Sequence, residues 1–263
     1  MKLKNPELHQ LFIAMVNLYG IIHSDEIIKI LQCYYPEIDK KDIMHYLKVV
    51  NNLYRADYFV AKIKNERGKF FLVNSFIEGE NDTEIIRERT NKPLYIPDTV
   101  EKLLKYRESN YFNEKETIVY NNLRSFLYKY YKPYKETKKP EKIDQFINFI
   151  HFNIKSGLYI TNQTFKKEIN TEIQVSKENF LEVKKVFADV LLETKMFVNK
   201  GYSLNELELI SKGELAINEQ KQSKIKDESK KYFYYKTISK TSQNISIEKC
   251  DDSFNDIDNY HKA

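Results

Sequence analysis

The N-terminal part of this chain shows three amphipathic helical patterns in succession. Apolar residues recur at spacings of three and four in three segments, Leu8–Tyr19, Ile27–Tyr34 and Ile43–Leu53. Gly20 is expected to end the first helix and Pro36 the second, because glycine adopts left-handed conformations and proline cannot continue a helix. Ser24 is expected to be the N-cap of the second helix. Three short helices are therefore predicted.

Two strand patterns follow these helices. Residues 57–64 are rich in strand-forming side chains, and residues 69–73 form a returning strand after a glycine-containing turn at 65–68. Three helices and a β-hairpin in this order predict a winged-helix-like domain in residues 1–77. Such domains usually bind DNA or another protein and rarely carry out chemistry, so a binding function is favoured.

The middle of the chain is predicted to be a linker followed by a helical domain. Residues 78–97 begin with a polar run and contain two prolines, which is typical of a linker. Residues 98–222 repeat helical apolar patterns. The last helix of this domain is expected to begin at Ser203, because Glu206 completes a capping-box pattern, and to run to about residue 222.

Residues 223–263 differ in character and are predicted to be a tail. Two stretches of strand-forming composition, 232–239 and 244–249, would form a small β-hairpin. The acidic end after residue 250 is expected to be disordered. The fold class predicted for the whole chain is therefore mainly α, with a winged-helix-like N-terminus and a small C-terminal hairpin.

Composition supports a helix-rich intracellular protein. The chain has 6 Gly and 6 Pro among 263 residues, too few for the turns of a doubly wound nucleotide-binding fold. Its two cysteines, Cys33 and Cys250, are too far apart in sequence to suggest a zinc cluster or a disulfide framework. No leader pattern or membrane-spanning apolar run is present, so a cytoplasmic location and no membrane partner are expected.

The charge pattern suggests a nucleic-acid site in the first domain. The net charge of +5 is only mildly basic, but cations gather in the wing and in the third helix. In a DNA-binding winged helix these would contact phosphates, and asparagines after the helix would reach base edges. The candidate residues are Lys48, Asn51, Asn52, Lys62, Lys64, Arg67 and Lys69. Asp39, Asp42 and Asp57 lie in the same region, and the alternative is a solvated charged surface.

A second basic and aromatic stretch spans residues 129–140. Its lysines would neutralise phosphates and its tyrosines would stack on unpaired bases. The candidates are Lys132, Lys135, Lys138 and Lys139. The favoured alternative is a helix end followed by a surface loop, because lysine is stabilised near a helix C-terminus by the helix dipole.

The sequence contains no recognisable catalytic signature. The histidines are scattered, and His151 is interpreted as a packed core residue on an apolar helix. Cys33 is interpreted as a small buried hydrophobe. Asp189 and Glu193 are spaced to share a helix face and could bind a cation, but such pairs often arise by chance in a chain with 38 Asp and Glu residues. We therefore expect a non-enzymatic protein without a metal or cofactor.

Three segments of the chain carry short motifs that point to a known group of proteins. They are Asn17–Ile22, then Ile96-Pro97 leading to Tyr106 and Tyr111-Phe112, and finally Glu193–Leu207 with its basic-Gly-aromatic step. In these segments the chain resembles a group of uncharacterised proteins from low-GC Gram-positive bacteria and their mobile elements. Some relatives end in a cysteine-rich SEC-C zinc motif, which this chain does not contain, so zinc binding is not carried over. The resemblance implies lineage and a phage or plasmid setting, where small helical proteins often regulate genes or block host defences.

Two functions follow from these patterns. The leading hypothesis is a nucleic-acid-binding or regulatory protein of a phage or other mobile element, with DNA as its partner. The alternative is a protein-interaction module, such as a phage-encoded inhibitor of a host defence complex, with a host or phage protein as its partner. In the alternative, exposed aromatic side chains would anchor the interface.

Overall fold

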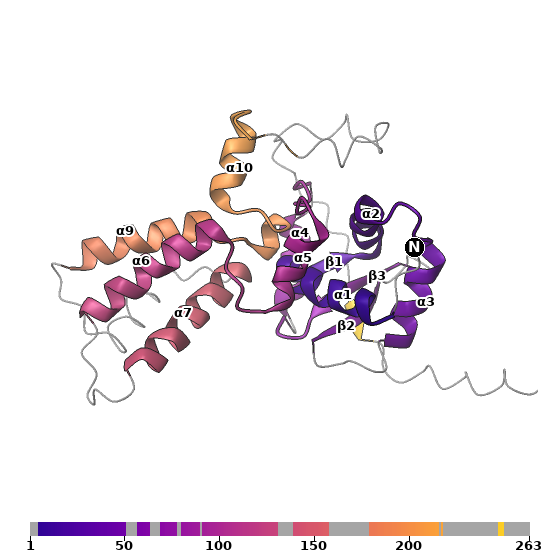
Figure 1. Ribbon diagram of the computed structural model, residues 1–263, viewed down its shortest axis with the longest axis horizontal. Coiled ribbons are helices and arrows are strands. Elements are labelled where there is room, and N and C mark those ends of the chain that lie inside the picture. Colours follow the sequence, from indigo (N-terminus) through magenta and orange to yellow (C-terminus); the bar gives the residue numbers. More distant parts are fainter. Residues whose placement is uncertain are drawn as a thin grey trace, which may run out of the picture.

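The protein is mainly helical, with one small antiparallel sheet. The computed structural model describes residues 5–50, 57–63, 69–77, 80–89, 91–130, 139–157, 179–215, 217 and 247–249. The sheet and helices α1–α3 lie at one end of the long axis, and helices α6, α7 and α9 lie at the other (Figure 1). No helix among the described residues is long and apolar enough to cross a membrane.

The N-terminal elements alternate helices and strands. In chain order they are α1 (Asn5–Tyr19), β1 (Ile21–His23), α2 (Ser24–Tyr34), α3 (Lys40–Val50), β2 (Tyr58–Ile63) and β3 (Phe70–Asn74). All pairings are antiparallel, and the sheet order is β1-β3-β2-β4, with β4 (Ile247–Lys249) beside β2. Leu72 of β3 lies opposite Ile22 of β1 and Val60 of β2. The predicted hairpin of β2 and β3 therefore has one further strand on each side, β1 beside β3 and β4 beside β2.

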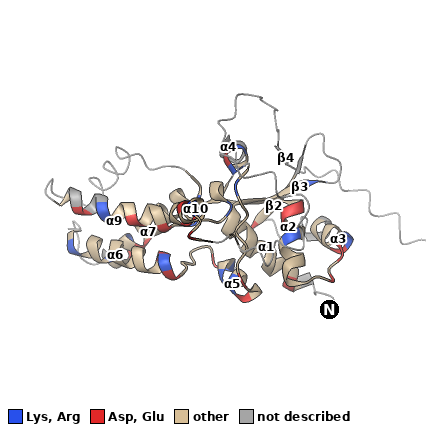
Figure 2. Cartoon of the chain, turned by 90° about the horizontal axis from the view of Figure 1, so that it is seen from above, with Lys and Arg blue, Asp and Glu red and all other residues tan. Residues whose placement is uncertain are grey.

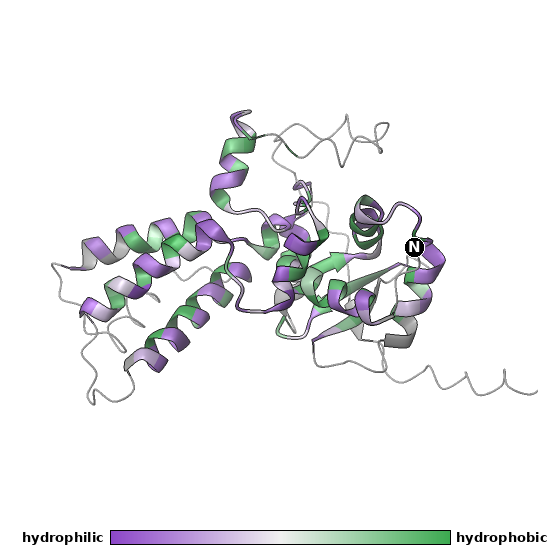
Figure 3. Cartoon of the chain, in the orientation of Figure 1, coloured by the Kyte–Doolittle hydropathy of each residue, from purple (hydrophilic) through white to green (hydrophobic). Residues whose placement is uncertain are grey.

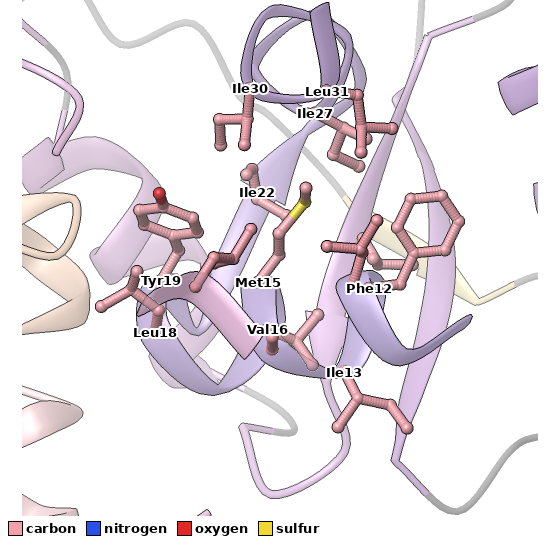
Figure 4. Packing of buried hydrophobic residues seen from close by; sticks show 14 of the residues in the cluster. Phe12, Ile13, Met15, Val16, Leu18, Tyr19, Ile22, Ile27, Ile30 and Leu31 are labelled. Atoms are coloured by element: carbon pink, nitrogen blue, oxygen red, sulfur yellow. The ribbon is translucent and has the colours of Figure 1, made fainter. Parts of the chain in front are cut away.

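Helix α1 is the centre of the N-terminal core. Its side chains are buried on almost every face, as is typical of a helix enclosed by other elements. In Figure 4, Phe12, Met15 and Tyr19 of α1 lie beside Ile22 of β1, and Ile27 of α2 faces them from above. This packing explains why the pattern from Leu8 to Tyr19 is more continuously apolar than a surface helix requires.

The start of α2 differs from the sequence prediction. His23, not Ser24, is the N-cap residue: its Nδ1 accepts the backbone N–H of Asp25 at 3.1 Å. The N–H of His23 donates to the carboxylate of Glu26 at 3.2 Å, which completes a capping box. The reason is that Ile21–His23 is extended and paired with β3, so the helix begins directly after this short strand.

The elements after the hairpin begin with short helices and continue with longer ones. They are α4 (Glu80–Arg89), α5 (Val100–Leu104), the 3-10 turn η1 (Lys105–Arg107), α6 (Glu114–Tyr130), α7 (Lys139–Lys155), α9 (Phe180–Glu193), the 3-10 turn η3 (Phe197–Asn199) and α10 (Leu204–Ser211). Helices α6, α7 and α9 pack together through apolar stripes that include Leu123, Ile147 and Val190. Figure 3 shows these stripes as green bands on otherwise polar helices.

The segment predicted as a linker is structured where it is described. Residues 80–89 form α4, and Leu94 and Ile96 are buried in the same core as α1. Leu103 and Tyr106, from the start of the predicted helical domain, join that core as well. The chain from Leu94 to Tyr106 therefore packs with the N-terminal elements.

The segment after α9 links the two ends of the molecule. Phe197 and Val198 of η3 are buried in a core that includes Ile21, Val73 and Ile77 on one side. The same core contains residues from α6, α7 and α9 on the other side, among them Leu123, Ile147 and Val190. The sheet and the helical bundle therefore share one continuous core.

Two further boundaries depart from the sequence predictions. Helix α10 ends at Ser211, not near residue 222, because the chain turns at Gly213, which has a φ of 74°. Within the predicted tail, residues 247–249 form β4, which pairs with β2 on the edge of the main sheet. The other strand pattern, 232–239, and the acidic end lie outside the described residues.

Candidate functional site

Helix α3 presents one face to the core and a charged face to solvent. Ile43, Tyr46 and Leu47 are buried, which confirms this part of the predicted apolar stripe. Lys40, Lys41, Asp42 and His45 are exposed on the opposite side. Asp39 stands at the start of the helix, where its carboxylate accepts the N–H of Lys41 at 2.8 Å. The exposed face of α3 is therefore available to a partner, but it carries both signs of charge.

The exposed carboxylate of Asp25 forms ion pairs with two lysines near the start of α3. Lys69, which precedes β3, has its Nζ 3.3 Å from Asp25, and Lys40 of α3 has its Nζ 3.9 Å away. These side chains are about half exposed, so the ion pairs contribute little to stability. The start of α2, the start of α3 and the returning strand of the hairpin thus meet at one charged surface.

The structure locates four of the sequence-predicted binding residues. Lys48 lies in α3, Lys62 lies in β2 opposite Phe70, Lys69 is exposed before β3, and Lys139 begins α7. The remaining candidates lie outside the described residues; they are Asn51, Asn52, Lys64, Arg67, Lys132, Lys135 and Lys138. Lys69 is the one whose side-chain surroundings are described, through its pairing with Asp25.

The two predicted basic stretches do not form one surface. The start of α7, which carries Lys139, and helix α3 lie toward opposite ends of the long axis (Figure 1). Both acidic and basic residues occur at each end of the molecule, as Figure 2 shows. A single nucleic-acid channel that uses both stretches is therefore not supported by this arrangement.

A buried ionic cluster around Glu26 was not predicted from the sequence. The Glu26 carboxylate of α2 is 3.3 Å from Nη2 of Arg89 in α4 and 2.8 Å from Nζ of Lys200 after η3. Burial raises the pKa of Glu26, but Arg89 and Lys200 lower it more, to about 2. No local sequence signal identifies this cluster, because its members are more than sixty positions apart.

A second buried cluster surrounds Glu116 at the start of α6. Glu116 is 1% exposed, and its carboxylate accepts the backbone N–H groups of Asn113 at 2.9 Å and of Lys195 at 2.8 Å. His151 of α7 has Nε2 3.9 Å from Glu116 Oε1. The burial of His151 confirms its interpretation as a core residue. Burial raises the pKa of Glu116, but His151 and the two N–H groups lower it, and the net shift is downward.

The side chain of Lys195 is held by an anion and by aromatic rings. Its Nζ donates to Glu206 of α10 at 2.6 Å and lies 3.7 Å from the centre of the Tyr95 ring. Glu206 also accepts the N–H of Ser203 at 2.9 Å, which confirms the capping box predicted for this helix. A cation between a carboxylate and an aromatic face fixes α10 against the segment before α5.

Tyr95, the residue before Ile96, connects α1 with the segment after η3. Tyr19 donates its hydroxyl hydrogen to the carbonyl of Tyr95 at 2.6 Å, and the N–H of Tyr95 donates to the carbonyl of Lys200 at 3.1 Å. Phe112 stacks near Tyr120, with ring centres 4.6 Å apart, beside the Glu116 cluster. These segments therefore build the junction between the sheet and the bundle.

The other candidates for chemistry are not assembled into a site. Among the residues that the structure describes, no group of three metal-binding side chains comes together. Asp189 is exposed, whereas Glu193 accepts the side-chain amide of Asn205 at 2.7 Å. Cys33 is partly buried and packs against the N-terminal core.

Comparison of the chain with known protein families, with curated proteins and with solved structures finds no match.

Proposed function

We propose that the N-terminal unit is a winged helix that binds DNA through α3 and the β2–β3 hairpin. The observation that carries this proposal is topological. The order α1-β1-α2-α3-β2-β3, with β1 and β2 on either side of β3, is the order expected of a winged helix and supports this proposal. It leaves α3 on the surface next to the hairpin, where a recognition helix and a wing would lie.

The charge distribution supports contact with phosphates more than readout of bases. Lys40, Lys41 and Lys69 are exposed around the start of α3. Lys48 also lies in α3, and Lys62 lies in β2 of the hairpin. Their neighbour Asp25 would lose its partners to the DNA backbone. Binding of this kind depends strongly on salt, because each neutralised phosphate releases condensed counterions.

The test is fluorescence anisotropy with a labelled random DNA duplex over a salt series, on the wild type and on a Lys41→Glu/Lys69→Glu variant. We expect affinity in the variant to fall by at least about tenfold at physiological salt. The slope of log affinity against log salt should become shallower by about 1 for each lost phosphate contact.

The matched control is Lys142→Glu/Lys185→Glu. These two lysines are exposed on α7 and α9, at the other end of the molecule, and the charge change is the same. An equal loss of affinity in the control would mean that only net charge matters. Unchanged binding by the Lys41→Glu/Lys69→Glu variant would overturn the proposed interface.

A protein-interaction function is the second candidate, and exposed apolar side chains favour it. Among the residues that the structure describes, six large apolar side chains are exposed, namely Phe76, Ile118, Tyr128, Phe149, Leu192 and Leu215. Aromatic anchors of this type often dominate protein interfaces. If the wild-type chain ignores DNA even at low salt, the winged helix would be a scaffold and a protein partner of a mobile element or its host would be the ligand.

A further inference from the structure

A cavity lies between the N-terminal unit and α7. Its volume is about 430 Å³, within the range of pockets that hold small molecules. Asn17 and Asn74 of the N-terminal unit line one side, and His151 and Lys155 of α7 line the other. Phe76, which is 69% exposed, stands at the rim. The cavity thus has a buried polar floor and an accessible apolar edge.

The floor contains two nitrogen groups. Nε2 of His151, a residue 3% exposed, is buried without a hydrogen-bond partner in the described part of the chain. Nζ of Lys155, a residue 5% exposed, lies 5.4 Å from the centre of the Phe197 ring. Leaving a buried polar atom without a partner is costly, so His151 points to a ligand that hydrogen-bonds to it, and the Lys155 ammonium group supplies a positive charge beside it.

The spacing along α7 directs these side chains to one place. Asn148, His151, Phe152 and Lys155 are spaced by three and four residues and all line the cavity. Phe152 also contacts Phe76 edge to face, with ring centres 6.2 Å apart. One surface of the helix therefore offers a cation, an imidazole, an amide and an aromatic ring to the same volume.

The nearby carboxylate does not take up the Lys155 ammonium group. Glu116 is oriented by the N–H groups of Asn113 and Lys195, and it makes no ion pair with Lys155 within 4.0 Å among the described residues. Burial lowers the pKa of Lys155 to about 8, and Glu116 opposes this shift only in part. At neutral pH the Lys155 ammonium group is therefore mostly charged, and no carboxylate of the described residues lies within 4.0 Å of it.

We propose that this cavity binds a small organic carboxylate with an apolar ring. The carboxylate would accept hydrogen bonds from Lys155 and from the Nε2–H tautomer of His151, and the ring would pack against Phe76 and Phe152. A monoanion matches the single lysine of the cavity wall better than a phosphate dianion does. The inference does not depend on DNA binding, because the cavity and the α3 surface share no residue.

The test uses the full chain with benzoate as the probe and benzamide as its neutral counterpart. Binding is followed by the NMR signal of ¹³Cε-labelled lysines, with the Lys155 signal identified by its loss in Lys155→Met. We expect benzoate to saturate with a Kd of about 1 mM and to raise the pKa of Lys155, whereas benzamide leaves this pKa unchanged.

Three variants separate a binding role from a structural one. Lys155→Met should weaken benzoate binding at least about tenfold, whereas Lys142→Met, which replaces an exposed lysine on the same helix, should leave it unchanged. Phe76→Ala removes an exposed rim residue and should weaken binding about fivefold even if Lys155→Met fails to fold.

Three results would overturn the proposal. The first is a Lys155 signal that does not respond to benzoate up to about 10 mM, which is well above the expected Kd. The second is equal benzoate affinity in the wild type and in both Lys155→Met and Phe76→Ala. The third is phenyl phosphate binding more tightly than benzoate with the same dependence on Lys155, which would replace the carboxylate by a phosphate ester.

Discussion

At the scale of single residues, Glu26 connects segments that are far apart in the chain. Its carboxylate caps α2 through the N–H of His23 and pairs with Arg89 and Lys200. Arg89 is buried, and its Nε and Nη1 lack hydrogen-bond partners among the described residues. The carboxylate that pairs with its guanidinium group is that of Glu26. Removing one partner of a buried pair is more damaging than the net contribution of the pair suggests.

Glu26→Gln should therefore destabilise the protein by about 3 kcal/mol at neutral pH, measured by urea unfolding. The pKa of Glu26 is lowered to about 2, so its stabilisation is complete above the unfolded value of about 4.3 and is lost as pH falls from there toward 2. The variant should then lose less stability than the wild type over that pH window. Glu141→Gln, which replaces an exposed carboxylate of α7, should change neither the stability at neutral pH nor its dependence on pH.

At the scale of elements, the turn between α1 and β1 fits closely against η3. Gly20 has a φ of 70°, in the left-handed region, and a Cβ there would lie 2.4 Å from Cγ of Phe197 and 2.7 Å from Cδ1 of Ile77. A side chain at this position would strain the backbone and also push η3 away from the sheet. The close approach of these elements requires glycine at this turn.

Gly20→Ala should cost about 3 to 4 kcal/mol of stability, combining backbone strain of about 1 kcal/mol with overpacking of the core. Gly213→Ala is the matched control, because Gly213 also has positive φ but a Cβ there would contact nothing within 4 Å. The control should cost only about 1 kcal/mol in the same thermal or urea measurement. Equal losses in the two variants would show that packing against Phe197 contributes nothing.

At the scale of the whole molecule, the sheet and the bundle are joined by a shared core. Phe71 and Val73 of β3 belong to the same apolar cluster as Leu127 of α6 and Ile150 of α7. Phe197 lies within this cluster, between the two ends of the molecule. Parts joined in this way cannot lose their packing independently.

The chain should consequently unfold in a single cooperative transition. Scanning calorimetry is expected to give equal calorimetric and van't Hoff enthalpies, and Phe197→Ala should lower the transition temperature of the whole chain. Two separate transitions, with Phe197→Ala affecting one of them, would contradict the shared core and favour the independent domains 1–77 and 98–222 suggested by the sequence.

Local patterns in the sequence were sufficient to predict several of the helices. The apolar spacing of Leu8–Tyr19 and of Ile43, Tyr46 and Leu47, and the capping box at Ser203, are local signals, and the structure confirms them. The hairpin was also predictable, because strand composition and its turn are adjacent in the chain. Such features depend on residues within a few positions of each other.

The short strand β1, the ionic clusters and the cavity could not be predicted from the sequence, because they form only through tertiary contacts. Ile21–His23 is too short to predict as a strand and is extended because β3 pairs with it. Glu26 meets Arg89 and Lys200, and Asn74 shares a cavity with Lys155, only after the chain has folded. The physical reason is that these contacts join distant positions, and local periodicity records which side of a helix is apolar but not which segment will cover it.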